Sequence, residues 1–188
     1  IIIAIDAGST NAGVCIFDQK SRSIKAFTVS SSKVKARSAI QTYISKCRDI
    51  HMKLRDIILE SCKQDDVLLT TEFPTGGSKS GAASRGMAMA IGLTSCLYNL
   101  NIKLGYAVTP IQVKRFVREN YHEIVGISLQ PNADISKYMV KAFISEYAKI
   151  HKMDIQDGTD HTFDAVAIAL LTVQSMSLDR EQIPARKS

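Results

Sequence analysis

The chain has 188 residues, of which 45% are hydrophobic and 22% charged, and its formal net charge is +6. This composition excludes wholesale disorder and fits one domain with a buried core. The basic balance favours a polyanionic partner, though it identifies none. The apolar opening, IIIAID, is too short for a signal peptide or a membrane span, and the four cysteines form no CxxC pair. We therefore expect a cytoplasmic protein with no membrane association, no disulfides and no zinc site.

The first half of the chain alternates between strands and one long helix. A three-stranded meander is predicted at residues 1–5, 14–17 and 24–29, where apolar runs are separated by turn-forming residues. Apolar side chains at three- and four-residue steps then predict an amphipathic helix over residues 36–63. Residues 66–71 follow as a buried strand. Because a helix connects it to the meander, this strand should run parallel to the first one.

The second half is predominantly helical. Residues 73–85 form a loop rich in Gly, Ser and Lys, and residues 86–100 an apolar helix whose small side chains fit core packing or a dimer interface. A fifth strand at 102–108 precedes helices at 111–120, 134–150 and 160–176, with a polar stretch at 121–131. The predicted fold is α/β, with a five-stranded mixed sheet flanked by helices. One domain covers residues 1–176, and a polar tail covers 177–188.

Acidic residues end two of the predicted strands. Asp6 follows the first strand and Glu72 follows the fourth. If these strands are parallel neighbours, both carboxylates emerge at the same edge of the sheet, where α/β proteins bind their ligands. Two carboxylates held together repel each other unless a proton or a cation lies between them. A hard divalent cation such as Mg²⁺ suits them.

Further polar residues begin the last helix. Asp157, Asp160, His161 and Asp164 recur at three- and four-residue spacing, and the apolar run AVAIALLTV follows. Acids at a helix N-terminus also simply interact well with the helix dipole, and this structural reading remains open. An apolar helix must nevertheless lie on the core, which brings its polar first turns to the sheet edge. Two strand-end carboxylates with a helical His and Asp would suit two-cation phosphodiester hydrolysis.

Three segments resemble the RuvC-type Holliday junction resolvases of the RNase H-like superfamily. They are IIIAIDAGSTNAGVCIFD, LLTTEFPTGGSKSGAASRGMAMAIG and DHTFDAVAIAL, and their order and spacing agree over nearly the whole chain. The resemblance implies a metal-binding catalytic quartet of Asp6, Glu72, His161 and Asp164, with Mg²⁺ as cofactor and Mn²⁺ as a substitute. The position of His161 is Asp in many members and His in some, and Asp160 is the alternative fourth ligand.

The resemblance also implies partners. The expected substrate is branched DNA, including four-way junctions, and the expected assembly is a homodimer with residues 86–100 as the candidate interface. In the loop after Glu72, Phe73 would stack on or wedge into the junction, unless it is an ordinary apolar loop residue. The chain length and a poorly matching second lysine suggest a phage-encoded member, acting in a bacterial or phage-infected cell. The candidate DNA-binding cations are Lys79, Arg85, Lys114, Arg115 and Lys137.

Three other interpretations remain open. The opening Asp-x-Gly-Ser-Thr also resembles the phosphate loop of actin-like ATPases and sugar kinases, but those proteins need two such domains and a second Asp-x-Gly hairpin is missing. We therefore expect no nucleotide cofactor. A non-catalytic DNA-binding relative would use the acids only as caps and ion-pair partners. Another RNase H-like nuclease would act on RNA:DNA hybrids or on RNA.

Overall fold

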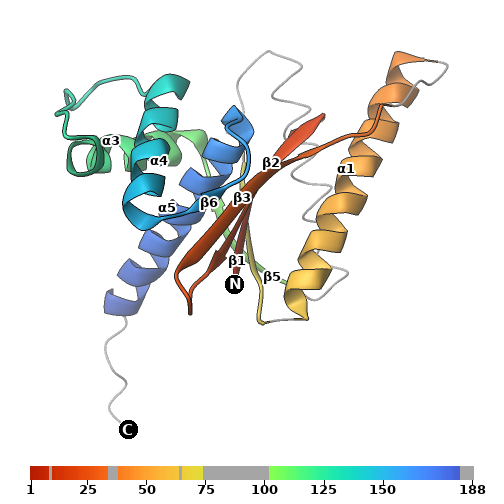
Figure 1. Ribbon diagram of the computed structural model, residues 1–188, viewed down its shortest axis with the longest axis horizontal. Coiled ribbons are helices and arrows are strands. Elements are labelled where there is room, and N and C mark those ends of the chain that lie inside the picture. Colours follow the sequence, from red (N-terminus) through yellow and green to blue (C-terminus); the bar gives the residue numbers. More distant parts are fainter. Residues whose placement is uncertain (9, 34–37, 64, 74–101, 183–188) are drawn as a thin grey trace, which may run out of the picture.

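The computed structural model describes residues 1–8, 10–33, 38–63, 65–73 and 102–182 (Figure 1). The described strands form one six-stranded sheet in the order β5-β4-β1-β2-β3-β6. The strands are β1 (Ile2–Asp6), β2 (Asn11–Asp18), β3 (Ser23–Ser30), β4 (Leu68–Glu72), β5 (Lys103–Val108) and β6 (Asp154–Ile155). The described helices are α1 (Ala39–Cys62), α3 (Pro110–Val125), α4 (Lys137–His151) and α5 (Asp160–Gln182). The helix predicted at 86–100 lies outside the described residues.

The strand directions place two acidic strand ends together. β1, β2 and β3 are antiparallel neighbours, as the predicted meander requires. β4 pairs with β1 in parallel, which confirms the predicted crossover, and β5 pairs in parallel with β4. The prediction of five strands was wrong, because the two-residue β6 adds a sixth strand beside Lys25 and Ala26 of β3. A pair of residues carries no periodicity from which a strand can be predicted.

Helices cover both faces of the sheet. Among the described helices, α1 lies on one face, and α3, α4 and α5 lie on the other (Figure 1). Successive strand residues point to opposite faces, so the apolar residues of β1 divide between two cores. Ile3 and Ile5 pack with buried residues of α1, whereas Ala4 belongs to the core on the α5 side. Asp6, two residues after Ala4, therefore projects towards α5.

α5 is the helix that positions the polar residues of the last motif. All six residues from Ala165 to Leu170 are buried, since the helix lies between the sheet and the pair α3 and α4. A helix covered on every side has no need of a polar face. α5 continues to Gln182, beyond the predicted end at residue 176. Within the described ranges, no helix combines the length and the hydropathy needed to cross a membrane.

α3 is also longer than predicted. It begins with a capping box, in which the side chains of Thr109 and Gln112 satisfy free backbone N–H groups. It continues to Val125, so the polar stretch predicted from residue 121 was wrong over its first five residues. The reason is Tyr121, which is buried on the same face as Val117 and extends the apolar period. Gly126, with φ 78°, ends the helix in the left-handed conformation.

Candidate active site

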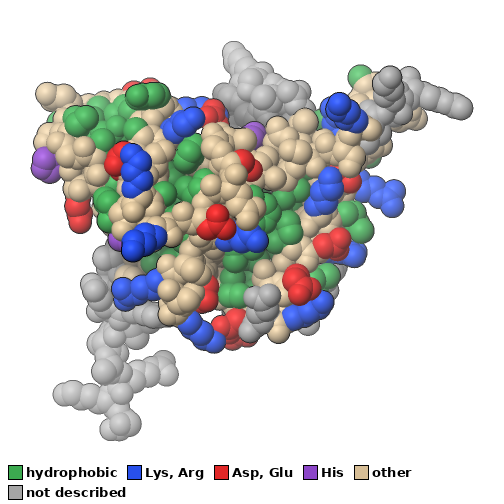
Figure 2. All heavy atoms as spheres, in the orientation of Figure 1, with side chains coloured by type: hydrophobic (Ala, Val, Ile, Leu, Met, Phe, Trp, Pro, Cys, Tyr) green, Lys and Arg blue, Asp and Glu red, His purple; other side chains and the backbone are tan. Residues whose placement is uncertain are grey.

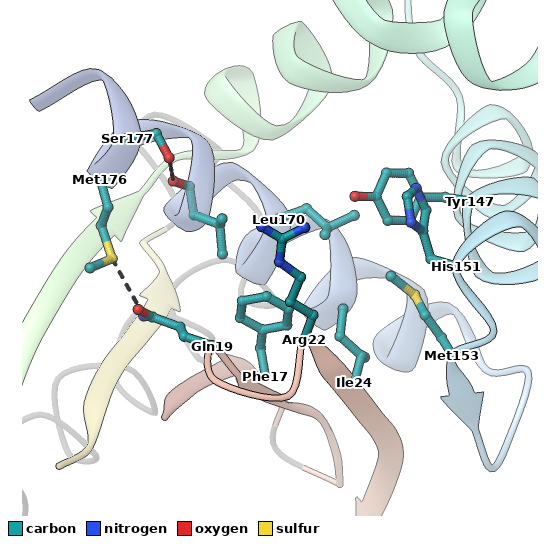
Figure 3. Close-up of a pocket in the computed structure, with 11 residues that line it drawn as sticks. Phe17, Gln19, Arg22, Ile24, Tyr147, His151, Met153, Leu170, Met176 and Ser177 are labelled. Atoms are coloured by element: carbon teal, nitrogen blue, oxygen red, sulfur yellow. Dashed lines mark hydrogen bonds between the residues drawn. The ribbon is translucent and has the colours of Figure 1, made fainter. Parts of the chain in front are cut away.

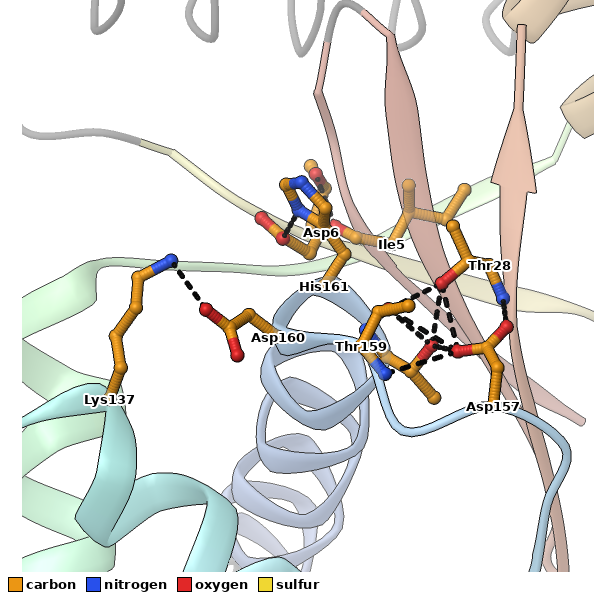
Figure 4. A network of polar contacts seen from close by, with 10 residues as sticks. Ile5, Asp6, Thr28, Lys137, Asp157, Thr159, Asp160 and His161 are labelled. Carbon is orange, nitrogen blue, oxygen red and sulfur yellow. Dashed lines mark hydrogen bonds and ion pairs between the residues drawn. The ribbon is translucent and has the colours of Figure 1, made fainter.

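Asp6 and His161 form the most direct contact between the sheet edge and α5. The Nδ1–H of His161 donates to Oδ2 of Asp6 across 2.6 Å (Figure 4). This hydrogen bond raises the pKa of His161 above its ordinary value, in spite of the opposing effect of burial. The sequence predicted both residues for the same site, and the fold brings them together. His161 is the second residue of α5, and Asp6 is the last residue of β1.

Glu72 and Asp164 are the other two members of the predicted quartet. Both are half-buried. Burial, followed by repulsion from Asp6 and Asp164, raises the pKa of Glu72 to about 7. Burial, followed by repulsion from Asp6, raises the pKa of Asp164 to about 6. Asp6 raises the pKa values of both Glu72 and Asp164, and Asp164 raises that of Glu72, so the three carboxylates lie within electrostatic reach of one another.

The chemistry of these donors fits a hard divalent cation. Carboxylate oxygens are the ligands that Mg²⁺ prefers, and a cation would relieve the repulsion that raises the pKa values. In the part of the chain that the structure describes, however, no three His, Cys, Asp or Glu side chains already stand together as a metal site. Asp6 is engaged with His161 instead. The four residues could therefore hold a cation only after their side chains turn towards it.

Asp160, the alternative fourth ligand, points elsewhere. Its carboxylate lies 3.7 Å from the ammonium group of Lys137, and its side chain is 56% exposed (Figure 4). Lys137 in turn lowers the pKa values of Glu72 and Asp164 by its positive charge, so it lies within electrostatic reach of both. His161, rather than Asp160, is thus the residue next to Asp6 in this arrangement.

Asp157 belongs to a different group, which the sequence did not predict. Its carboxylate accepts hydrogen bonds from the N–H of Thr28 at 2.6 Å and from the hydroxyls of Thr28 and Thr162 (Figure 4). Burial acts to raise the pKa of Asp157, but these hydrogen bonds outweigh it and hold the pKa below its ordinary value. Thr159 completes the group, within 2.5 Å of the Thr28 hydroxyl. We refer to Thr28, Thr159 and Thr162 around Asp157 as the threonine cluster.

Gly13 allows α5 to approach the sheet. A Cβ atom at this position would overlap the carbonyl oxygen of His161, whereas one at Gly158 would meet only the Phe163 ring, at 4.0 Å. We therefore expect Gly13→Ala to lower the free energy of unfolding by roughly 1–3 kcal/mol, as overpacking does. Urea unfolding measures this loss, with Gly158→Ala as the matched control. Equal stability of the two variants would contradict the close approach.

The candidate DNA-binding residues are only partly described. Lys114 pairs with Asp134 at 2.9 Å, and Arg115 with Glu119 at 2.7 Å. Lys79 and Arg85 lie outside the described residues. On the face shown in Figure 2, Lys and Arg side chains alternate with Asp and Glu and form no single basic patch. The N–H of Phe73, directly after β4, donates to the carbonyl of Val108 at 2.7 Å, so its backbone continues the β4–β5 pairing.

A hollow of about 430 Å³ is lined by none of these carboxylates; Figure 3 shows its lining residues. It is lined by Phe17 and Ile24, which pair at the far end of the β2–β3 ladder from Gly13, and by side chains of α4 and α5. Its only ionisable lining groups among the described residues are Arg22, Tyr147 and His151. It contains none of the predicted site residues, so we place the candidate active site at the carboxylates.

Comparisons with known proteins support the fold. No protein-family model matches the sequence, and no curated protein matches it. Two solved structures of RuvC from Thermus thermophilus do match the structure. One, in complex with Holliday junction substrate, has a TM-score of 0.56 and 14% identity, over 94% of this chain and 95% of that chain. The other has a TM-score of 0.58 and 19% identity, over 95% and 96%. The chain therefore has the RNase H-like fold of these RuvC structures, with a mixed sheet covered by helices on both faces.

Proposed function

We propose that the protein is a divalent-metal-dependent endonuclease that cuts Holliday junctions and other branched DNA. The observation that carries the proposal is the convergence of Asp6, Glu72, His161 and Asp164 at one sheet edge. A similar fold in a protein solved with Holliday junction substrate adds support. Bound cations would activate the attacking water and stabilise the leaving oxygen.

The residues of the chain have distinct proposed roles. Asp6, Glu72 and Asp164 would supply carboxylate oxygens to the cations, and His161 would complete the set in preference to Asp160. In the metal-free arrangement the hydrogen bond to Asp6 places a proton on Nδ1 of His161, and Nε2 is the ring nitrogen that could contact a cation once the side chain turns. Mg²⁺ is the proposed ion, with Mn²⁺ as a substitute that imidazole ligands also suit.

The basic residues would bind the DNA backbone. Lys114, Arg115 and Lys137 each lie beside an exposed carboxylate, and surface pairs of this kind are weak enough to exchange for phosphate. Lys79, Arg85 and Phe73 would act from the loop after Glu72. Each lysine or arginine that neutralises a phosphate releases counterions, so junction affinity should fall steeply with salt.

We further propose a homodimer, because symmetric cutting of a four-way junction requires two active sites related by a two-fold axis. The proposed interface is the segment 86–100, whose many small side chains allow close approach of a second helix. Light scattering with and without junction tests this assembly. A monomer mass under both conditions would contradict it.

A panel of labelled substrates tests the function itself. Four-way junction, linear duplex and RNA:DNA hybrid are incubated with the protein in Mg²⁺ and separately in Mn²⁺. We expect cutting of the junction in preference to the duplex and the hybrid. Preferential cutting of the hybrid would favour another RNase H-like nuclease. Absence of junction cutting at any divalent concentration would overturn the proposal.

A further inference from the structure

Three residues of the sheet lie side by side beneath the first turn of α5. Asp6 pairs with Gly13 between β1 and β2, and Gly13 pairs with Thr28 between β2 and β3. Side chains of directly paired residues point to the same face of a sheet. Asp6 and Thr28 therefore both project towards α5, on either side of a residue without a side chain. We refer to these three as the Asp6–Gly13–Thr28 row.

The first turn of α5 contacts every member of this row. The imidazole of His161 hydrogen-bonds to Asp6 at 2.6 Å. The backbone of His161 and Thr162 lies directly against Gly13, where a Cβ atom would overlap it. The hydroxyl of Thr162 lies 2.8 Å from the hydroxyl of Thr28. The turn is thus held at three points, and only the contact to Asp6 belongs to the candidate active site.

Asp157 links Thr28 of β3 to the residues at the start of α5 through its carboxylate. The N–H and O–H of Thr28 donate to its two carboxylate oxygens at 2.6 and 2.9 Å, and the N–H of Thr159 approaches one of them at 3.5 Å. The N–H groups of Thr28 and Thr159 can only donate, and they approach different oxygens of Asp157. The side chain at residue 157 must therefore present two acceptor atoms. Thr159 also caps the helix, because its hydroxyl accepts from the N–H of Thr162 at 3.2 Å. The threonine cluster therefore joins β3 to the start of α5.

From these contacts we infer that Thr28 is a positioning residue, which acts through Asp157 and Thr162 to hold His161 against Asp6. The inference rests on the proposed function, because it concerns how that active site is built. Thr162 directly follows His161 and lies two residues before Asp164, so a shift of this turn moves both site residues together. A displacement of about 1 Å at a reacting centre can cost roughly a hundredfold in rate.

Three variants separate positioning from stability. Thr28→Val removes the hydroxyl at nearly constant volume, and Thr28→Ser retains it. Thr172→Val is the matched control, because Thr172 is a fully buried threonine of the same helix, more than two turns beyond Asp164. Its hydroxyl donates to Ile168 O at 2.8 Å and lies 3.1 Å from the hydroxyl of Thr70 on β4, and it contacts neither His161 nor the threonine cluster. For each protein we would measure kcat on a four-way junction, junction Kd, and the ¹⁵N resonances of the His161 ring without metal or DNA.

We expect Thr28→Val to lower kcat by roughly tenfold to a hundredfold at unchanged Kd, and to shift the His161 Nδ1 resonance. Thr28→Ser should restore both values, and Thr172→Val should leave both as in the wild type. A wild-type His161 resonance in Thr28→Val, or the same shift in Thr172→Val, would overturn the inference. A wild type that cuts no substrate would contradict the proposed function alone, since the resonances are measured without DNA and still decide the positioning role.

Discussion

Asp6→Asn is expected to abolish junction cutting while junction binding remains intact. The asparagine keeps the shape of the side chain but loses the charge that would hold a cation, and its remaining oxygen accepts from His161 as a neutral amide, which is a weaker acceptor than a carboxylate. Loss of metal stabilisation worth about 4 kcal/mol corresponds to roughly a thousandfold in rate. Binding should persist, because lysines and arginines supply most of the affinity for DNA. Cleavage assays and gel-shift titrations, the latter in metal-free buffer, measure the two effects separately.

Asp160→Asn is the matched control for this prediction. It makes the same chemical change on α5, but at a side chain that is exposed and paired with Lys137. We expect it to cut at close to the wild-type rate. If Asp160→Asn were as inactive as Asp6→Asn, Asp160 rather than His161 would be the fourth ligand. If Asp6→Asn lost junction binding without metal, its defect would lie in folding or binding and not in chemistry.

The meeting of Asp6 and Glu72 could be predicted from the sequence because parallel pairing fixes both strand ends. The apolar runs before each acid identified buried strands, and the helix between them required a crossover. β1 and β4 are indeed parallel neighbours, with Ile5 beside Thr71. The apolar run after Asp164 similarly predicted a core helix, and α5 is buried on all sides from Ala165 to Leu170. In both cases the elements are buried, and this burial is the reason for the apolar runs from which they were predicted.

The separate role of Asp157 could not be predicted, because the direction in which its side chain points depends on the residue at which α5 begins. Helical spacing places Asp157 with Asp160, His161 and Asp164 only if the helix already includes residue 157. α5 begins at Asp160, after the N-cap Thr159. Asp157 is thus a loop residue whose side chain turns to β3. The available signal was the two threonines interleaved with the acids, since threonine favours N-caps and local hydrogen bonds over helix interiors.

The close approach of the α5 backbone to Gly13 could not be predicted from the sequence either. Gly13 precedes the second predicted strand, 14–17, yet it lies within β2, and its missing side chain admits the backbone of His161. Residues 74–101, with the candidate loop cations Lys79 and Arg85 and the candidate dimer helix, lie outside the described part of the chain. Those assignments remain predictions from the sequence.

Glu72→Gln is expected to stabilise the metal-free protein while it removes activity. The raised pKa values of Glu72, about 7, and Asp164, about 6, mean that the folded state binds protons more tightly than the unfolded chain. The contribution of these two groups to stability is then largest at acidic pH and falls as the pH rises from about 4 to about 7. At pH 8 without divalent ions, Glu72 and Asp164 are ionised in the folded wild type, and their repulsion and burial lower its free energy of unfolding. Glutamine preserves the shape and removes one charge.

The gain at pH 8 should be about 2 kcal/mol, somewhat below the full linkage value because the carboxylates are coupled. For a chain of this size that raises Tm by about 4–8 °C.

Thermal unfolding in EDTA at pH 5 and pH 8 measures this gain, with exposed Glu60→Gln as control. The advantage of Glu72→Gln should shrink at pH 5, where Glu72 is protonated in the folded wild type. It should also shrink when Mg²⁺ is added at pH 8, because the cation replaces the missing proton and stabilises the wild type more than the variant. A Glu72→Gln variant no more stable than the wild type at pH 8 in EDTA would mean that the three carboxylates do not repel one another as their positions require.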